Sequence, residues 1–254
     1  MTDHEFSGMV VIVTGAGKGI GRATAIAFAA CDARVVLSGQ SKEPLMETLK
    51  LIEQDGGAAK VVVGDVSTEG AAYEAVALAV KEFGRLDFAV NNAGVSPWTG
   101  STVDCTLETW RRVLDVNLTG TWLGMKYQIP AILQGGRGGA VVNMTSVAAL
   151  QVFEGYPAYS ASKWGVVGVT RVAALEFAAK GVRVNAIAPG SIETPLFANV
   201  VNSTPTSRDE YEKQTPMGRI ARAQEVAAAA TWLCSAAASY VTGAVLPVDG
   251  GMTL

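Results

Sequence analysis

Seven short apolar runs of strand length recur along this 254-residue chain, and segments with helical spacing separate most of them. The runs cover residues 10–14, 34–38, 60–63, 86–91, 140–145, 182–188 and 244–248, and the helical segments cover 21–30, 42–54, 69–83, 107–133 and 157–180. Apolar strands that alternate with helices are typical of a parallel sheet buried on both faces. The pattern predicts one doubly wound α/β domain over residues 1–254, with a seven-stranded parallel sheet flanked by helices.

Two stretches depart from this alternation. Residues 191–217 are rich in Thr, Pro, Ser and Asn, which predicts a long irregular segment, either a candidate substrate-binding loop or a mere surface excursion. Residues 226–248 carry no charge and are roughly as long as a membrane span. Their Ala, Ser and Thr content, with Gly243 and Pro247, instead indicates a core helix, a turn and a buried strand, so no membrane partner is expected.

Composition excludes several functions. The 20 Lys and Arg residues against 23 Asp and Glu residues leave no basic excess for nucleic-acid binding. One histidine, His4, is too few for a Ser/His/Asp triad or a multi-histidine metal site, and no metal is expected. The polar start lacks a secretory signal and the cysteines form no CxxC pair, which favours a cytoplasmic location. We expect Cys31, Cys105 and Cys234 to be buried small hydrophobic residues.

A glycine-rich turn follows the first predicted strand and opens the first predicted helix, Thr14-Gly15-Ala16-Gly17-Lys18-Gly19-Ile20-Gly21. Glycines adopt positive φ angles and let the backbone approach a pyrophosphate, and the helix N-terminus offers unpaired N–H groups to that anion. At the start of a series of strand–helix units, the turn indicates dinucleotide binding. Its spacing is GxxxGxG and does not match GxGxxG.

Three motifs in order resemble the short-chain dehydrogenase/reductase family: the glycine turn, Asn91-Asn92-Ala93-Gly94, and Tyr159-Ser160-Ala161-Ser162-Lys163. The segments Pro189-Gly190-Ser191-Ile192-Glu193-Thr194 and Val248-Asp249-Gly250-Gly251 extend the resemblance over essentially the whole chain. It implies a Rossmann fold and hydride transfer between a nicotinamide and a carbonyl or alcohol carbon. The cofactor contacts that it implies are Gly15, Lys18, Gly19, Ile20, Gly21, Asp65, Val66, Asn92, Ala93, Gly94, Tyr159, Lys163, Pro189, Gly190, Ile192 and Thr194.

The end of the second predicted strand bears on the choice of nicotinamide cofactor. An Asp or Glu at this place accepts a hydrogen bond from the 2′-OH of NAD and repels the 2′-phosphate of NADP. This chain has Gly39 followed by Gln40, and Lys18 offers positive charge, as does Lys42 if its loop bends inward. We expect a preference for NADP(H), with NAD(H) as the alternative, although many NADP-using relatives have Arg where this chain has Gln40.

Tyr159 and Lys163 are four residues apart in a predicted helix and therefore share one face of it. An ammonium group near a phenol is expected to bring the phenol pKa down toward the working range of an acid–base catalyst. Tyr156 is excluded from this pairing because Ser160, four residues on, carries no charge. The resemblance further implies that Ser146 hydrogen-bonds the substrate oxygen and that Asn117 supports a water in a proton relay toward Lys163.

Aromatic and apolar residues in the segments that line the pocket of similar enzymes predict an apolar, cyclic or aryl ketone substrate. These residues are Trp98, Phe153, Tyr156, Leu196 and Phe197, and the alternative is that they only close the loop over the core. The helix predicted at 157–180 is apolar on more than one face, which favours a homo-oligomer, and relatives commonly form tetramers. Ketone reduction is the preferred function; an NAD-dependent alcohol dehydrogenase of the same family and a non-catalytic dinucleotide-binding regulator are the alternatives.

Overall fold

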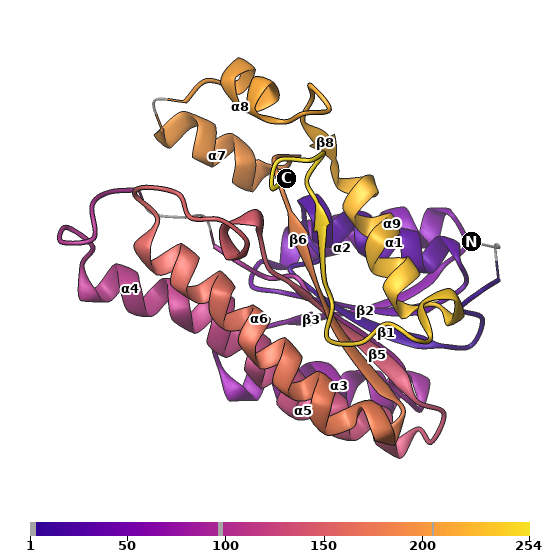
Figure 1. The fold of residues 1–254 in the computed structure, drawn as a ribbon. Helices are drawn as coiled ribbons and strands as arrows, with labels where there is room; N and C mark the ends of the chain where they lie inside the picture. Colours follow the sequence, from indigo (N-terminus) through magenta and orange to yellow (C-terminus); the bar gives the residue numbers. More distant parts are fainter. Residues whose placement is uncertain (1–3, 96–98, 205) are drawn as a thin grey trace.

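A seven-stranded parallel sheet forms the centre of the molecule, as predicted. The computed structural model describes residues 4–95, 99–204 and 206–254. Its strands lie in the order β3-β2-β1-β4-β5-β6-β9 (Figure 1). Their bounds are β1 Val10–Thr14, β2 Arg34–Gly39, β3 Ala58–Val63, β4 Phe88–Asn91, β5 Gly139–Met144, β6 Val182–Pro189 and β9 Val245–Val248. The chain order reverses between β1 and β4, and in such sheets ligands bind in the crevice beyond the carboxyl ends of the strands at this point.

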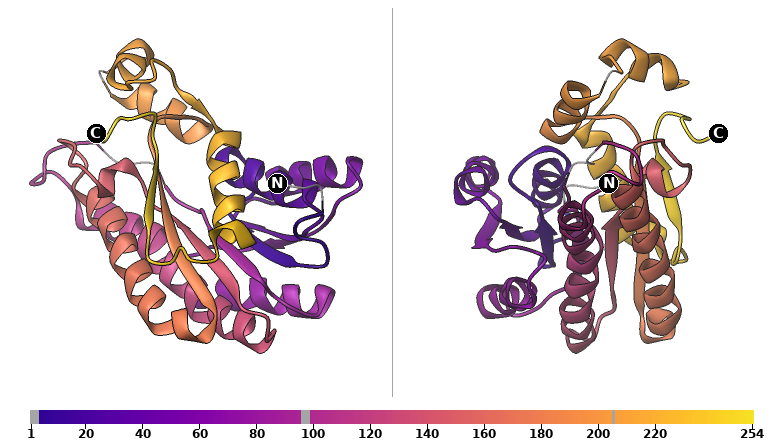
Figure 2. Two further views of the ribbon diagram at one scale, coloured as in Figure 1. Left: turned by 45° about the vertical axis from the view of Figure 1, so that its right-hand side comes forward. Right: turned by 90° about the vertical axis from the view of Figure 1, so that its left-hand side faces the viewer.

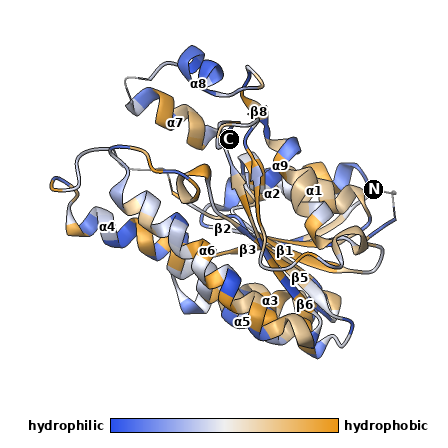
Figure 3. Ribbon diagram, in the orientation of Figure 1, coloured by the Kyte–Doolittle hydropathy of each residue, from blue (hydrophilic) through white to orange (hydrophobic). Residues whose placement is uncertain are grey.

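Helices cover both faces of the sheet (Figures 1 and 2). One face carries α1 Gly19–Ala30, α2 Lys42–Gln54 and α9 Ala223–Cys234, and the other carries α3 Glu69–Phe83, α5 Gly120–Gln134 and α6 Pro157–Phe177. Side chains alternate along β1, so that Val11 and Val13 join the core beneath the first group while Val10 and Ile12 join the core beneath the second. This two-sided burial explains why residues 10–13 of the central strand β1 are all apolar (Figure 3).

The helix predicted at 107–133 is divided by one π-helical segment. Helix α4 covers Leu107–Leu114, the π-helix η1 covers Asp115–Thr119, and α5 follows directly. Asn117 lies fully buried inside this segment, where its side chain accepts a hydrogen bond from Val95 N and donates one to Ser162 Oγ. A π-turn inserts an extra residue into the helix, which turns a side chain inward at this point.

The prediction of an irregular segment at 191–217 is wrong, because two helices form there. They are α7 Pro195–Ser203 and α8 Arg208–Gln214, and the short strand β7 Ile192–Glu193 pairs with β8 Ala221–Arg222. Thr194 caps α7 through the backbone N–H of Phe197, and a proline is tolerated at the first helical position. Ser207 and Glu210 form a capping box for α8. Figure 2 shows this pair of helices set apart from the layers that cover the sheet.

The uncharged stretch at 226–248 contains most of α9, the 3-10 helix η4 Ala236–Ala238 and β9, which confirms the predicted helix and strand. Strand β9 lies at the edge of the sheet and is only half-buried, so its expected full burial is wrong. Full burial is also wrong for two cysteines: Cys234 is buried, whereas Cys31 and Cys105 are partly exposed. Among the described residues, no helix has the length and apolar character needed to cross a membrane. Two further 3-10 helices are η2 Val147–Ala149 and η3 Ala178–Lys180.

Candidate active site

A cavity of about 650 Å³ lies beyond the carboxyl ends of the strands, between the glycine turn, the start of α6 and the α7–α8 segment. It brings together most of the site residues predicted from the sequence. Those that line it are Gly15, Lys18, Gly19, Ile20, Asn92, Ala93, Gly94, Ser146, Phe153, Tyr156, Tyr159, Lys163, Pro189, Gly190, Ile192, Thr194, Leu196 and Phe197.

Other predicted residues lie outside the lining of this cavity. Gly21 lies in α1 and Asn117 in η1, and neither lines the cavity. Four others lie at or just beyond the ends of β2 and β3: Gly39, Gln40, Asp65 and Val66. Trp98 falls outside the described residues.

The glycine turn is folded as a close-packed loop at the start of α1. Gly15 and Gly19 have φ angles of +65° and +54°, which non-glycine residues rarely adopt. A Cβ atom built on Gly21 would lie 2.2 Å from the carbonyl oxygen of Gly15. Lys18 forms the N-cap of α1 without a side-chain cap hydrogen bond, so the first turn of this helix keeps N–H groups that suit an anion. The loop therefore fits the pyrophosphate of a dinucleotide.

The ends of β2 and β3 place Gln40 and Asp65 in contact. The Asp65 carboxylate accepts hydrogen bonds from the backbone N–H and hydroxyl of Ser67, at 2.9 and 2.7 Å. The Ser67 hydroxyl is the main cause that lowers the pKa of Asp65, and the Gln40 side chain lowers it further. The Asp65 carboxylate thus has its hydrogen-bond partners within the protein. Gly39, at the end of β2, has no side chain that could contact the cofactor.

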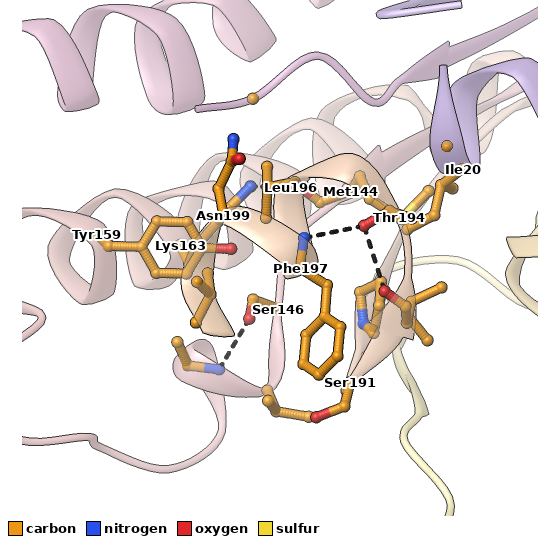
Figure 4. Close-up of a pocket in the computed structure, with 18 of the residues that line it drawn as sticks. Ile20, Met144, Ser146, Tyr159, Lys163, Ser191, Thr194, Leu196, Phe197 and Asn199 are labelled. Atoms are coloured by element: carbon orange, nitrogen blue, oxygen red, sulfur yellow. Dashed lines mark hydrogen bonds between the residues drawn. The ribbon is translucent and has the colours of Figure 1, made fainter. Parts of the chain in front are cut away.

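Tyr159 and Lys163 project from the first turns of α6, and Ser146 is the second residue after β5 (Figure 4). The Lys163 Nζ atom lies 5.5 Å from the centre of the Tyr159 ring and donates a hydrogen bond to the carbonyl oxygen of Met144 at 3.1 Å. The Ser146 hydroxyl accepts from Ala148 N at 3.2 Å and is hydrogen-bonded to the Tyr159 hydroxyl. A phenol, a hydroxyl and a buried amine therefore meet at one wall of the cavity.

The expected lowering of the Tyr159 pKa by Lys163 is not what the structure shows. Burial raises the pKa of Tyr159, and the hydrogen bond with Ser146 offsets only part of that rise. Burial also lowers the pKa of Lys163 to about 8, because the charged amine is removed from water. Tyr159 is therefore protonated at neutral pH, which is the form that donates a proton.

Asn117 supports this wall from behind. Its Nδ2 atom donates to Ser162 Oγ at 3.2 Å, and Ser162 Oγ donates to the carbonyl oxygen of Tyr159 at 2.7 Å. A Cβ atom built on Gly94 would lie 3.2 Å from Asn117 Oδ1 and 3.7 Å from Lys163 Nζ, so both side chains flank the same small space. The structure thus brings Asn117 close to Lys163.

Several further lining residues were not predicted individually from the sequence. Within the segment 191–217, the predicted candidate substrate-binding loop, they include Asn199, Val200, Thr206, Tyr211 and Gln214. Outside that segment, the unpredicted lining residues include Val95, Met144, Glu154 and Met252. The capping box at Ser207 and Glu210 is a signal for α8, which carries Tyr211 into the cavity. Met252 arrives through the C-terminal turn, which Asp249 stabilises by accepting from Gly251 N and Thr253 N. No local sequence pattern predicts that Met252 lines the cavity.

Comparison with known proteins shows the family of this chain. Residues 15–253 match a family model described as enoyl-(acyl carrier protein) reductase. The chain is 42% identical to 3β-hydroxysteroid dehydrogenase 1 of Eggerthella lenta, covering 98% of this chain and 95% of that one, and 40% identical to cyclohexanol dehydrogenase of an Acinetobacter species, covering 98% and 97%. The solved structure of levodione reductase is 35% identical, with a TM-score of 0.94 over 98% of each chain.

Solved structures of two relatives contain different nicotinamide cofactors, NADP in one and NADH in the other. A putative 2-deoxy-D-gluconate 3-dehydrogenase of Agrobacterium tumefaciens, 36% identical with a TM-score of 0.89 over 99% of each chain, holds NADP. A 3-ketoacyl-(acyl-carrier-protein) reductase of Brucella melitensis, 33% identical with a TM-score of 0.91 over 98% of this chain and 100% of that one, holds NADH. The chain belongs to the short-chain dehydrogenase/reductase family and is an NAD(P)-dependent oxidoreductase that acts on CH–OH and C=O groups.

Proposed function

We propose that this enzyme reduces an apolar cyclic or aryl ketone to a secondary alcohol with NADPH. The observation that carries the proposal is the cavity itself, where Ser146, Tyr159 and Lys163 share a wall with the aromatic and apolar side chains of Phe153 and Phe197. An apolar pocket with a few convergent polar groups suits an apolar molecule with one reactive oxygen. Two relatives are named for cyclohexanol and a 3β-hydroxysteroid, which are both ring alcohols.

In this mechanism a bound nicotinamide supplies the hydride. Tyr159 donates its proton to the substrate oxygen, and Ser146 donates a second hydrogen bond that polarises the carbonyl. Lys163 stabilises the phenolate that Tyr159 becomes, and Asn117 positions α6 through Ser162. Because burial raises the pKa of Tyr159, the proton donor is in its active form at neutral pH, whereas alcohol oxidation needs the ionised form.

The preference for NADPH rests on charges near the adenosine end of the cofactor site. Gly39 provides no carboxylate at the end of β2 to repel a 2′-phosphate. Lys18 is exposed at the start of α1 and lines the cavity. A cation at this place attracts the extra phosphate without any need for a bidentate contact.

The function is tested by mixing the protein with NADPH or NADH and aryl, cyclic and aliphatic ketones. We expect loss of the reduced-nicotinamide absorbance, with a higher kcat/KM for NADPH. In Lys18→Ala the ratio of kcat/KM for NADPH to that for NADH should fall about fivefold or more, because one charge-assisted contact contributes about 1 kcal/mol or more. Lys50→Ala, which removes an exposed lysine of α2, should leave the ratio unchanged. A wild-type advantage for NADH contradicts the cofactor preference, and turnover of no ketone contradicts the function.

We also propose that the protein is a homo-oligomer, with a tetramer favoured, in which α6 contacts a second copy of the chain. Trp164, Val172 and Leu175 are large apolar side chains on the outer face of α6, and their exposed fractions in the single chain are 49%, 55% and 85%. Trp122 of the neighbouring α5 is 47% exposed. Large exposed apolar side chains of this kind mark protein interfaces.

Light scattering should give about four times the 26.3 kDa mass of the chain. Leu175→Glu should shift the protein to smaller species, because the carboxylate would be buried without a partner in the interface. Leu51→Glu introduces the same change at a partly exposed leucine of α2 and should not alter the mass. A monomeric wild type, or a Leu175→Glu variant of unchanged mass, contradicts this assembly.

A further inference from the structure

Arg22 of α1 holds the first two turns of α2 in a hydrogen-bonded clamp. Its guanidinium donates from Nε to Thr48 Oγ1 at 3.0 Å, and from Nη2 to the carbonyl oxygen of Pro44 at 3.2 Å and to the Glu47 carboxylate at 2.7 Å. Positions 44, 47 and 48 lie on one face of α2. None of these four residues lines the cavity, so the clamp acts from outside the cofactor site.

The Thr48 hydroxyl connects this clamp to the glycine turn. It donates a hydrogen bond to the carbonyl oxygen of Ala16 at 2.9 Å, and Ala16 N donates to the carbonyl oxygen of Ser38 at 3.1 Å. Thr48 and Ala16 are fully buried, so water cannot take the place of either partner. Both backbone groups of Ala16 are therefore held, which fixes the orientation of the two peptides that flank Ala16 in the turn.

Arg22 determines which acceptor receives the Thr48 proton. A threonine hydroxyl within a helix can donate to the carbonyl oxygen four residues earlier, and here Pro44 O lies 3.1 Å from Thr48 Oγ1. Arg22 Nη2 supplies a donor to Pro44 O, while Arg22 Nε occupies a lone pair of Thr48 Oγ1. Since the hydroxyl has one proton, it is directed to Ala16 O, the nearer acceptor.

The same part of α2 packs tightly against both loops of the dinucleotide site. A Cβ atom built on Gly17 would lie 2.9 Å from Pro44 Cβ, and one built on Gly39 would lie 3.4 Å from Leu45 Cδ2. Residues 40–41 alone connect β2 to α2. The position of α2 therefore sets the spacing between the glycine turn, which fits the pyrophosphate, and the end of β2, which faces the adenosine ribose in this fold.

We propose that Arg22 is a positioning residue for the nicotinamide dinucleotide: through Thr48 it holds the glycine turn in the conformation that binds the pyrophosphate. This role applies to NADPH and NADH alike, so it does not depend on the ketone substrate or on the cofactor preference proposed above. Loss of the clamp should weaken cofactor binding and leave the chemistry at Tyr159 unaffected. The effect should therefore appear in the Kd and KM of the cofactor and not in kcat.

Titration of the reduced-nicotinamide fluorescence measures the Kd of NADPH without any substrate. In Thr48→Val the Kd should rise about fivefold to tenfold, as expected for one lost buried hydrogen bond, whereas Thr48→Ser keeps the hydroxyl and should stay within about twofold of the wild type. Arg22→Met should raise the Kd by about tenfold, because it releases the Thr48 proton to Pro44. If Arg22→Met fails to fold, the comparison of Thr48→Val with Thr48→Ser decides the outcome.

The double variant Arg22→Met, Thr48→Val tests whether Arg22 acts through Thr48. Both changes break one connection to Ala16, so the double variant should bind NADPH within about twofold of the weaker single variant. Two effects that multiply in full would show that Arg22 and Thr48 act independently, which overturns the proposal.

Arg183→Met is the matched control for a merely structural arginine. Arg183, at the start of β6, donates to four carbonyl oxygens at and beyond the end of α9, those of Leu233, Cys234, Ser235 and Val241. Its loss should lower the melting temperature and leave the Kd of NADPH unchanged. An unchanged Kd in Thr48→Val, or an equal rise of the Kd in folded Arg183→Met, overturns the proposal. A wild type that reduces no ketone refutes the function proposed above, whereas the Kd values still decide the role of Arg22.

Discussion

Replacing Tyr159 with Phe is expected to lower the turnover number for ketone reduction by about 10²–10⁴-fold, the usual contribution of a positioned general acid. The Tyr159 phenol combines a hydrogen bond to Ser146, proximity to Lys163 and a pKa raised by burial, so it holds a proton at neutral pH. Phenylalanine keeps the ring and removes only the proton donor. Steady-state rates at saturating cofactor measure the effect.

Two controls separate catalysis from folding and binding. The dissociation constant for NADPH should change little in Tyr159→Phe, because the glycine turn and the end of β4 remain intact. Tyr73→Phe, which makes the same change at an exposed tyrosine of α3 outside the cavity lining, should keep wild-type turnover. A Tyr159→Phe enzyme with more than about a tenth of wild-type turnover contradicts the role of Tyr159 as the general acid.

Gly21→Ala is expected to weaken cofactor binding by at least about tenfold and to lower the melting temperature by about 5–10 °C. The added Cβ would lie 2.2 Å from the Gly15 carbonyl oxygen and 2.5 Å from Asn92 Nδ2. Asn92 donates from this Nδ2 atom to the carbonyl oxygen of Thr14 at 2.9 Å, so the clash displaces both the glycine turn and the end of β4. Fluorescence titration with NADPH and thermal denaturation measure the two effects.

Gly70→Ala is the matched control. Gly70 lies in the first turn of α3, its φ angle is not positive, and an added Cβ would meet no heavy atom within 4 Å. Alanine has a helix propensity better than that of glycine by about 1 kcal/mol, so this variant should be as stable as the wild type or slightly more so. Wild-type cofactor affinity in Gly21→Ala would show that the packing of the glycine turn does not control binding.

Local patterns in the sequence predicted much of this site. The glycine turn between β1 and α1 and the four-residue spacing of Tyr159 and Lys163 depend on residues close together in the chain, and the structure places them as expected. Helices α7 and α8 were missed because prolines and hydroxyl residues suggest breaks. The same residue types also start helices, as Thr194 with Pro195 and Ser207 with Glu210 do.

The π-turn at Asn117 and the pKa of Tyr159 could not be predicted in this way. The side chain of Asn117 faces Val95 and Ser162, which come from two other parts of the chain. The Tyr159 pKa depends on how completely the surrounding fold removes the phenol and the nearby amine from water, which residue spacing does not report.

The sequence by itself determined the parallel sheet, the glycine turn and the helix face that carries Tyr159 and Lys163, because hydrophobic periodicity and short-range spacing act within a few residues. Only the tertiary structure decided which distant side chains share the cavity. Asn117 approaches Lys163 through the packing of helical segments that lie far apart along the chain. Burial, hydrogen-bond partners and pKa values are properties of those long-range contacts, since each depends on everything that surrounds a group in space.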